Sequence, residues 1–493
     1  MPCTTLLVGK KASYDGSTMT ARNEDSGSTG FTAKKMTVVQ PEQQPKVYRS
    51  VLSHVEIPLP ENPMRYTAMP NANPKEGIWG AAGVNTANVS MTATETLTSN
   101  ERVLSADPMV KLVAAEGGKK EIPGGIGEED MVTLVLPYIS SAREGVLRLG
   151  SLLSRYGTYE MNGIAFQDAD EVWWLETIGG HHWIARRVPD ECYVVMPNQL
   201  GIDAFDLEDA FGDKKEHLCS DDLREFISEN HLDLGQEGPF NPRLAFGSRS
   251  DADHVYNTPR AWWIERYFNP RTNCWDGPEA DYRPDSDDIP WCRVPEAKIT
   301  PEDVKYALSG HYQGTPYDPY ARHGDSSMRG SLRPIGVNRN NFLSLVQIRQ
   351  EMPEATRALE WVAFGSNVFN ALVPLFSQVD SVPFYFENTG DIPSTDSFYW
   401  VNRMIAALAD PHFGKCANHI ERYQLSLQSE ARAIVLRAEK EAAAAKEEER
   451  KAICEKANAE IAALTRQKTD ELLSHVLLEA SFGMKNAFAR SDA

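Results

Sequence analysis

The chain has 493 residues, 41% of them hydrophobic and 24% charged, as in ordinary globular proteins, and its length allows one large domain or two smaller ones. Its 70 acidic and 50 basic side chains give a net charge of -20, which repels nucleic acid and anionic lipid and disfavours both as partners. The absence of a long apolar run, of a secretion signal and of CxxC pairs predicts a cytoplasmic protein without a membrane span, a zinc site or a disulfide framework.

The first residues predict a β-hairpin. Two runs rich in β-branched and apolar residues, 3–9 and 17–23, flank an Asp-Gly turn signal. With the loop centred near residue 13, Cys3 lies opposite about residue 23, which brings Arg22 and Asp25 close to the start of the chain. A plain structural hairpin with a polar exit shows the same pattern, so the hairpin alone does not define a site.

The middle of the chain predicts strands and helices that are segregated more than alternating, which favours an α+β fold. The expected segments are a Pro-rich surface excursion over 40–75, two strands over 77–96, helices over 107–117 and 139–156, and four short strands of an antiparallel meander over 163–199. A loop-rich excursion over 268–335 follows, and helices and strands return from about 350 to 410.

Residues 418–490 predict one or two long amphipathic helices. Apolar residues recur there at three- and four-residue steps, with no Pro, and with no Gly before Gly483. Two interpretations stay open: a charged helix that is packed on the body or frayed in solvent, or a self-association helix that would make a homo-oligomer. Glu448 and Glu449 interrupt the apolar stripe and weaken a coiled-coil interpretation.

Several familiar catalytic motifs are missing from the sequence. It contains no GxSxG, HExxH or GxxxxGK[ST] motif, and the glycines of residues 124–130 (GGIGEED) do not have a phosphate-binding spacing. His181 and His182 precede apolar residues, which favours a structural role over metal binding, and the tryptophan pairs at 173–174 and 262–263 are typical of a core. We therefore expect neither a metal nor a cofactor.

Cys3 remains as the candidate nucleophile. If residues 1–2 are removed, this residue carries both a thiol and a free α-amine, whose pKa in reference peptides is roughly 7.7–8.0. The amine can accept the thiol proton without a histidine partner. Arg22 would lower the pKa of the thiol, and the carboxylate of Asp25 would hold the amine. The alternative is an ordinary cysteine on an edge strand.

The segment CTTLLVGKKASYDGSTMTARNEDS closely resembles the N-terminus of the PepD-type dipeptidases, cysteine peptidases of the N-terminal-nucleophile (Ntn) hydrolase superfamily. The similarity continues through GVNTANVSMTATET, YNTPRAWWIERYFNP and TDSFYWVNRMIAALAD, over roughly residues 3–412. It implies a four-layer αββα sandwich of two stacked antiparallel sheets. We therefore expect a propeptide at 1–2 that is removed and a dipeptidase domain at 3–415, followed by a helical extension at 416–493 that the apolar periodicity predicts.

The pattern around Cys3 also resembles that of the penicillin V acylases and bile salt hydrolases. This resemblance implies that Cys3 is nucleophile and base, with Arg22 and Asp25 around its thiol and amine. Asn198 matches an asparagine whose side chain helps to bind the oxyanion, and Arg260 matches a supporting arginine. A second oxyanion donor would fall near the end of MTATET, where the residue type differs from that of those relatives.

The implied function is hydrolysis of dipeptides through a thioester acyl-enzyme. Recognition of the two charged substrate termini predicts Glu95 as a partner for the ammonium group and Arg186 or Arg187 as a partner for the carboxylate, although a cross-strand surface pair explains these residues equally well. Two other functions stay open: an acylase-like hydrolase of non-peptide amides, and a non-catalytic interaction protein that binds through the 418–490 helix.

Overall fold

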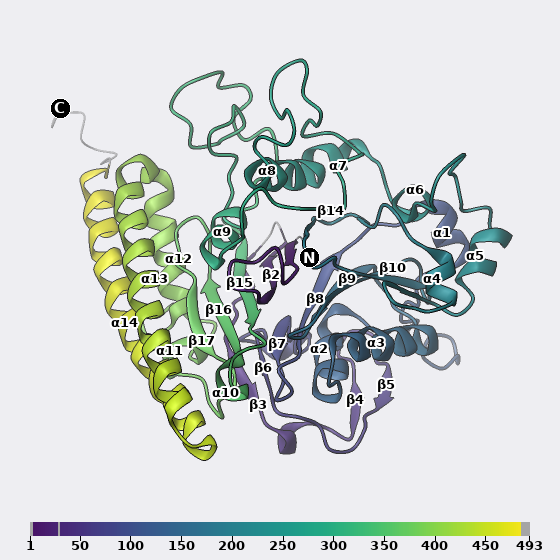
Figure 1. Ribbon diagram of the computed structural model, residues 1–493, viewed down its shortest axis with the longest axis horizontal. Coiled ribbons are helices and arrows are strands. Elements are labelled where there is room, and N and C mark those ends of the chain that lie inside the picture. Colours follow the sequence, from purple (N-terminus) through teal and green to yellow (C-terminus); the bar gives the residue numbers. More distant parts are fainter. Residues whose placement is uncertain (1–2, 28–29, 485–493) are drawn as a thin grey trace.

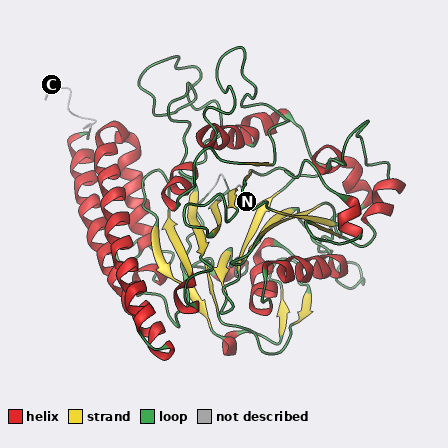
Figure 2. Ribbon diagram, in the orientation of Figure 1, coloured by secondary structure: helices red, strands yellow, loops and turns green. Residues whose placement is uncertain are grey.

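The computed structural model describes residues 3–27 and 30–484, with side chains except at 94 and 95. It has a mixed α+β fold in which two antiparallel sheets lie at the centre and most helices lie outside them (Figures 1 and 2). This confirms the predicted α+β class.

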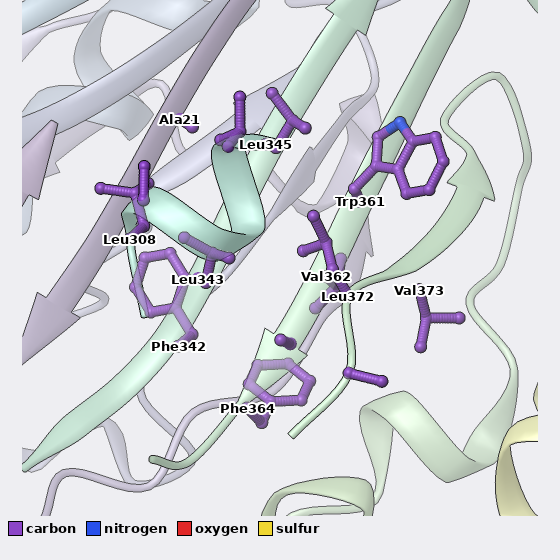
Figure 3. Close-up of a cluster of buried hydrophobic side chains, with 14 of the residues drawn as sticks. Ala21, Leu308, Phe342, Leu343, Leu345, Trp361, Val362, Phe364, Leu372 and Val373 are labelled. Carbon is purple, nitrogen blue, oxygen red and sulfur yellow. The ribbon is translucent and has the colours of Figure 1, made fainter. Parts of the chain in front are cut away.

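The larger sheet has seven strands in the order β14-β12-β1-β2-β15-β16-β17 (Figure 1). Its strands are β1 (Cys3–Val8), β2 (Thr18–Asp25), β12 (Tyr193–Met196), β14 (Cys292–Arg293), β15 (Asn340–Ile348), β16 (Ala358–Phe364) and β17 (Val373–Phe376). The predicted hairpin is confirmed as β1 and β2, which occupy the middle of this sheet. Figure 3 shows side chains of β15 and β16, among them Phe342, Leu345 and Trp361, in a buried hydrophobic cluster beside the hairpin.

The smaller sheet has six strands in the order β13-β11-β10-β9-β8-β7. Its strands are β7 (Ala82–Val84), β8 (Ser90–Thr96), β9 (Asn162–Gln167), β10 (Val172–Thr177), β11 (Trp183–Arg187) and β13 (His217–Cys219). The two strands predicted over 77–96 are β7 and β8. The 40–75 excursion carries two short strand pairs, β3 (Thr37–Val39) with β6 (Tyr66–Ala68) and β4 (Val47–Arg49) with β5 (Glu56–Pro58).

The predicted meander of four strands is correct for three of them. Strands β9, β10 and β11 pair consecutively, but β12 crosses to the other sheet and pairs with β1. All four residues of β12 are buried, so this strand needs neighbours on both of its edges and cover on both faces. A position between β1 and β14 supplies those neighbours, and it places the segment after β12 beside the start of the chain.

One predicted helix is wrong and another is confirmed. Residues 107–117 do not form the expected helix. The nearest helix is α1 (Glu101–Ala106), which Asn100 caps and which ends before Pro108. Proline disfavours helical conformation in the residue before it, and Gly117 and Gly118 adopt positive φ angles beyond it, so the helical spacing there has no helix. The helix expected over 139–156 is α3 (Ala142–Tyr156), with Ser141 as its N-cap.

The other helices before residue 410 are short, apart from α8 and α12. They are α2 (Glu128–Val135), α4 (Leu207–Phe211), α5 (Leu223–Glu229), α6 (Pro242–Phe246), α7 (Asp251–Tyr256), α8 (Thr258–Phe268), α9 (Pro301–Ala307), α10 (Glu354–Arg357), α11 (Phe384–Glu387) and α12 (Phe398–Ala409). Only β14 and α9 interrupt the loops of the 268–335 excursion in the described chain, as its composition predicts.

The C-terminal segment forms two long helices, α13 (Phe413–Ala444) and α14 (Glu447–Phe482), which lie side by side along one flank of the molecule (Figure 1). Their buried residues, including Leu427 and Ile461, belong to the same hydrophobic cluster as the larger sheet. Of the interpretations of this segment, packing of the helices on the rest of the protein therefore matches the structure.

Asn458 of α14 completes the edge of the larger sheet. Its Oδ1 accepts a hydrogen bond from the backbone N–H of Phe376 at 2.9 Å, and its Nδ2 donates to the carbonyl of the same residue at 2.9 Å. Phe376 lies in the edge strand β17 and both residues are buried. The side-chain amide thus takes the place that a further strand would occupy.

Replacing Asn458 with alanine is expected to lower the free energy of unfolding by about 2–6 kcal/mol, because it leaves two buried backbone groups without partners at roughly 1–3 kcal/mol each. Urea denaturation followed by circular dichroism measures the change. Gln467 of the same helix is exposed, and its side chain bonds to exposed Glu471 and to no other residue that the structure describes, so Gln467→Ala serves as the control. Equal stability of the two variants would contradict the importance of this contact.

Candidate active site

The candidate nucleophile Cys3 is the first residue of β1, and its side chain is fully buried. It pairs with Glu24 of β2, one residue beyond the predicted partner. Residues directly opposite each other in antiparallel strands share a face, and so do residues two apart in one strand. Arg22 therefore lies on the face of the Cys3 thiol, and its Nη2 lies 3.0 Å from the sulfur.

Arg22 is held in place by partners from distant parts of the chain. Its Nη2 also contacts Glu128 Oε1 at 2.8 Å, and its Nη1 donates to the carbonyl of Ala93 at 2.5 Å. The guanidinium is completely buried and cannot move without breaking these contacts. A fixed positive charge beside sulfur favours the thiolate over the thiol.

A second buried ion pair adjoins Arg22. The Nζ of Lys34 lies 3.0 Å from Glu24 Oε1, and Arg22 Nη2 lies 3.6 Å from the other oxygen of Glu24. Burial lowers the pKa of Lys34 and the carboxylate of Glu24 opposes that shift. Two cations, Arg22 and Lys34, are thus balanced by the carboxylates of Glu24 and Glu128. Buried charges at this density cost desolvation energy and are more useful for chemistry than for stability.

The N-terminal turn of α2 supplies Glu128 together with two more buried acidic residues, Glu129 and Asp130. Glu160 accepts a hydrogen bond from the backbone of Glu128 at 2.7 Å. Burial and the charge of Glu128 raise the pKa of Glu160 to about 7, and burial and Glu129 raise the pKa of Asp130 to about 7. The carboxyl groups of Glu160 and Asp130 therefore titrate near neutrality.

Asn198 and Arg260 meet at the backbone of Cys3. The N–H of Cys3 donates to Asn198 Oδ1 at 3.2 Å, and Arg260 Nη2 donates to the same oxygen at 2.7 Å. Arg260, on α8, also donates through Nη1 to the carbonyl of Cys3 and to Thr4 Oγ1. Because its oxygen has these two donors, the amide of Asn198 has one orientation.

The structure places Asp25 at the end of β2, where its carboxylate accepts hydrogen bonds from Arg333 and from Asn340 of β15. Burial opposes the charge of Arg333, but the neighbouring Asp25 and Tyr256 raise its pKa above the usual value. Asp25 directly follows Glu24 in β2, and side chains alternate along a strand, so Asp25 points to the face of the sheet opposite the Cys3 thiol. Contact of Asp25 with the amine of Cys3 stays a prediction.

The predicted partners of the substrate termini are less informative. The side chain of Glu95 lies outside the described part of the structure. Arg187 forms ion pairs with Glu171 at 3.1 Å and with Asp190 at 2.7 Å. Arg186 lies 3.5 Å from Asp203 and lines a separate cavity of about 360 Å³. Both arginines belong to β11 of the smaller sheet, whereas Cys3 lies in the larger one.

A cavity of about 720 Å³ opens at Asn198, the residue whose side chain accepts a hydrogen bond from the backbone of Cys3. Its walls include Thr96 at the end of β8, Asn198 after β12, and Tyr256 and Asn257 at the end of α7. This volume lies within the range of roughly 300–1,000 Å³ usual for small-molecule sites and is ample for two amino acids. Asn198 therefore connects the cavity to the backbone of Cys3.

Other candidate sites are structural. Both His181 and His182 bond to Asp107 through Nδ1, at 2.9 and 2.7 Å, and the tryptophan pairs are buried in the core. Within 3–27 and 30–484, no cluster of His, Cys, Asp and Glu has the arrangement that a metal ion needs. No helix among these same residues has the length and apolar character that crossing a membrane requires.

Sequence reasoning missed Glu128 and Arg333, which hold Arg22 and Asp25. Glu128 lies in the GGIGEED segment, whose glycine spacing fits no phosphate site; the three acidic residues after a Gly N-cap are the signal that could have found it. Arg333 lies in the loop-rich 268–335 excursion, which carries several arginines without a pattern that distinguishes this one.

A buried cysteine thiol beside a guanidinium, in a mixed α+β fold with an adjoining cavity, has the features that a cysteine peptidase requires. The model of Peptidase family C69 matches residues 2–426, and the chain belongs to this family.

Full-length relatives carry dipeptidase names. The chain is 55% identical over 532 residues to "Dipeptidase" of Bifidobacterium longum (strain NCC 2705), with 100% of both chains covered. It is 51% identical over 491 residues to "Probable dipeptidase A" of Streptococcus pyogenes serotype M18 (strain MGAS8232), covering 99% of this chain and 98% of the other. Identity to "Dipeptidase A" of Lactobacillus helveticus is 46% over 414 residues, or 83% and 82% of the two chains.

Proposed function

We propose that the protein is a dipeptidase in which Cys3, freed as the N-terminal residue by removal of residues 1–2, is the nucleophile. The observation that carries this proposal is the 3.0 Å contact between Cys3 Sγ and the buried guanidinium of Arg22. The dipeptidase names of the full-length relatives support the substrate class.

Attack begins with a proton transfer within Cys3 itself. The neutral α-amine takes the proton of the thiol, and Arg22 stabilises the thiolate that results. The sulfur then forms a bond to the carbonyl carbon of the peptide, and the electron pair of the C=O bond moves to oxygen. Arg260 and Asn198 hold the backbone of Cys3 while this happens.

The amide of Asn198 is oriented to help at the next step. Its Oδ1 accepts from Arg260 and from the nitrogen of Cys3, so its Nδ2 is the group that can donate to the oxyanion. As the oxyanion collapses, the bond from carbon to the leaving nitrogen breaks. The ammonium of Cys3 gives its proton to that nitrogen and the C-terminal amino acid departs, leaving a thioester on Cys3.

Water completes the cycle. The amine of Cys3 is neutral again and removes a proton from a water molecule, whose oxygen attacks the thioester carbon. The carbon–sulfur bond breaks, the sulfur recovers the proton, and the N-terminal amino acid is released. Both protons needed in the cycle thus pass through the α-amine, so the reaction needs no histidine.

We also infer that the two sheets stack as the inner layers of an αββα sandwich. A side-chain hydrogen bond of 2.6 Å joins Thr20 of β2 to Gln167 of β9, across the two sheets. Helices α2 and α3 share a core with the smaller sheet, and α12 to α14 share one with the larger sheet. The division into a body at 3–415 and an extension at 416–493 is part of the same proposal.

The function is tested with the purified full chain and three kinds of substrate: dipeptides, tripeptides and N-acylated amino-acid amides. We expect release of free amino acids from dipeptides at least about tenfold faster, in kcat/KM, than cleavage of either alternative, a preference worth about 1.4 kcal/mol. Faster hydrolysis of the acylated amides would favour the acylase interpretation. Absence of hydrolysis with all three would contradict a hydrolytic function.

A further inference from the structure

The cavity beside Asn198 contains a charge that the proposed reaction does not use. Arg249 is the one positively charged side chain among the described residues that line this cavity, and it lies in the loop between α6 and α7. The acidic residues in the lining are Glu101 and Asp253. An otherwise polar or acidic cavity with a single guanidinium has a defined place for one anionic group.

The chain direction places Arg249 toward the catalytic side of the cavity. A backbone bridge joins Ser99 and Gly247 in antiparallel orientation, so residue 249 runs back alongside residue 97 and toward Thr96. Glu101 lies beyond the bridge in the other direction. Arg249 also lines a small second cavity with Pro197 and Gln199, the neighbours of Asn198. It therefore lies between the end of β8 and the segment that carries Asn198.

The guanidinium of Arg249 is available for a ligand. Across the described residues, no hydrogen bond or ion pair engages its side chain, and the side chain is exposed. Asp253, the acidic residue nearest to it in sequence among those that line the cavity, is occupied: its Oδ2 accepts from Ser250 and its Oδ1 from Asn257 at 2.6 Å. The charge of Arg249 is thus not neutralised by its own loop.

We propose that Arg249 binds the C-terminal carboxylate of the dipeptide substrate; the inference rests on the proposed function. Guanidinium groups bind carboxylates through two parallel hydrogen bonds, which fix the position as well as the charge of the ligand. In a dipeptide the carboxylate is one Cα removed from the scissile nitrogen. Each further residue moves it by roughly 3.3–3.6 Å, so a fixed arginine selects the length of the substrate.

The test compares alanyl-alanine with alanyl-alanine amide, which differ only in the charge of the C-terminus, in the processed full-length enzyme. We expect Arg249→Gln to lower kcat/KM for the free acid by roughly 10- to 100-fold, as for a lost hydrogen bond to a charged group, and to change kcat/KM for the amide less than about threefold. Arg249→Lys keeps the charge but not the paired donors and should recover part of the loss.

Arg224→Gln is the matched control, because Arg224 is an exposed arginine that pairs with Glu208 at 2.8 Å and is not among the described residues that line the cavity. It should leave the preference for the free acid unchanged. Arg186→Gln tests the other arginine predicted for this carboxylate, which lines a separate cavity and contacts Asp203. Equal losses for acid and amide in Arg249→Gln, or a selective loss in Arg186→Gln, would overturn the inference while leaving the dipeptidase function standing. Failure of the unmodified enzyme to cleave either compound would overturn both.

Discussion

Replacing Cys3 with alanine is expected to abolish dipeptide hydrolysis, with kcat reduced by roughly 10⁴-fold or more, as for the loss of a catalytic nucleophile. The substitution removes the sulfur that forms the thioester and leaves Arg22 facing an empty position. Processing should fail in the same variant if the thiol also attacks the carbonyl of Pro2. Amino-acid release measures the first effect, and intact mass measures the second.

The expected masses separate the outcomes. Wild-type protein should lack the first two residues, whereas Cys3→Ala should keep Pro2, because only cleavage of the bond from Pro2 to residue 3 needs the thiol. Cys274 provides the control, because it is an exposed free cysteine outside the site, and Cys274→Ala should match the wild type in mass and activity. Normal hydrolysis by Cys3→Ala, or an active wild type that keeps both residues, would disprove the N-terminal nucleophile.

Asn198→Ala is expected to lower kcat by roughly 10²- to 10³-fold with little change in KM, because the lost donor acts on charge that exists only in the transition state. Arg260 loses one acceptor in this variant but keeps Asn257, the carbonyl of Cys3 and Thr4 as partners. The cavity wall should therefore survive.

Steady-state kinetics with a dipeptide, together with a thermal unfolding curve, distinguish chemistry from damage to the fold. Asn198→Asp supplies a second comparison, since its carboxylate still accepts from Arg260 but adds a negative charge beside the oxyanion. We expect it to be at least as slow as Asn198→Ala. A kcat within about threefold of the wild type in either variant would remove Asn198 from the oxyanion site.

Local patterns were sufficient to predict the hairpin that carries Cys3 and Arg22. The β1–β2 hairpin follows from β-branched runs around a turn, and the predicted register missed the observed one by a single residue. That residue matters, because strand side chains alternate: pairing of Cys3 with Glu24 brings Arg22 to the thiol and turns Asp25 away. The resemblance supplied Asn198 and Arg260, which lie 195 and 257 residues from Cys3 in sequence.

Long-range partners could not be predicted for a physical reason. Glu128 reaches Arg22 across 106 residues and Arg333 reaches Asp25 across 308, and neither contact leaves a periodic trace in the sequence. The same holds for β12, whose short apolar run fits either sheet. The proline after Asp107 was the local signal against the helix expected at 107–117, and it outweighs the helical spacing there. Cytoplasmic location and oligomeric state stay predictions.

The contact between Asn458 and Phe376 has a consequence for biosynthesis. Strand β1, which carries Cys3, leaves the ribosome first. The edge strand of the same sheet, β17, gains its partner only when Asn458 has been synthesised, 82 residues after Phe376. Until that part of the polypeptide has been translated, a nascent chain exposes β-strand backbone to whatever other chains are nearby. A messenger truncated before α14 should therefore yield insoluble product rather than a smaller working enzyme.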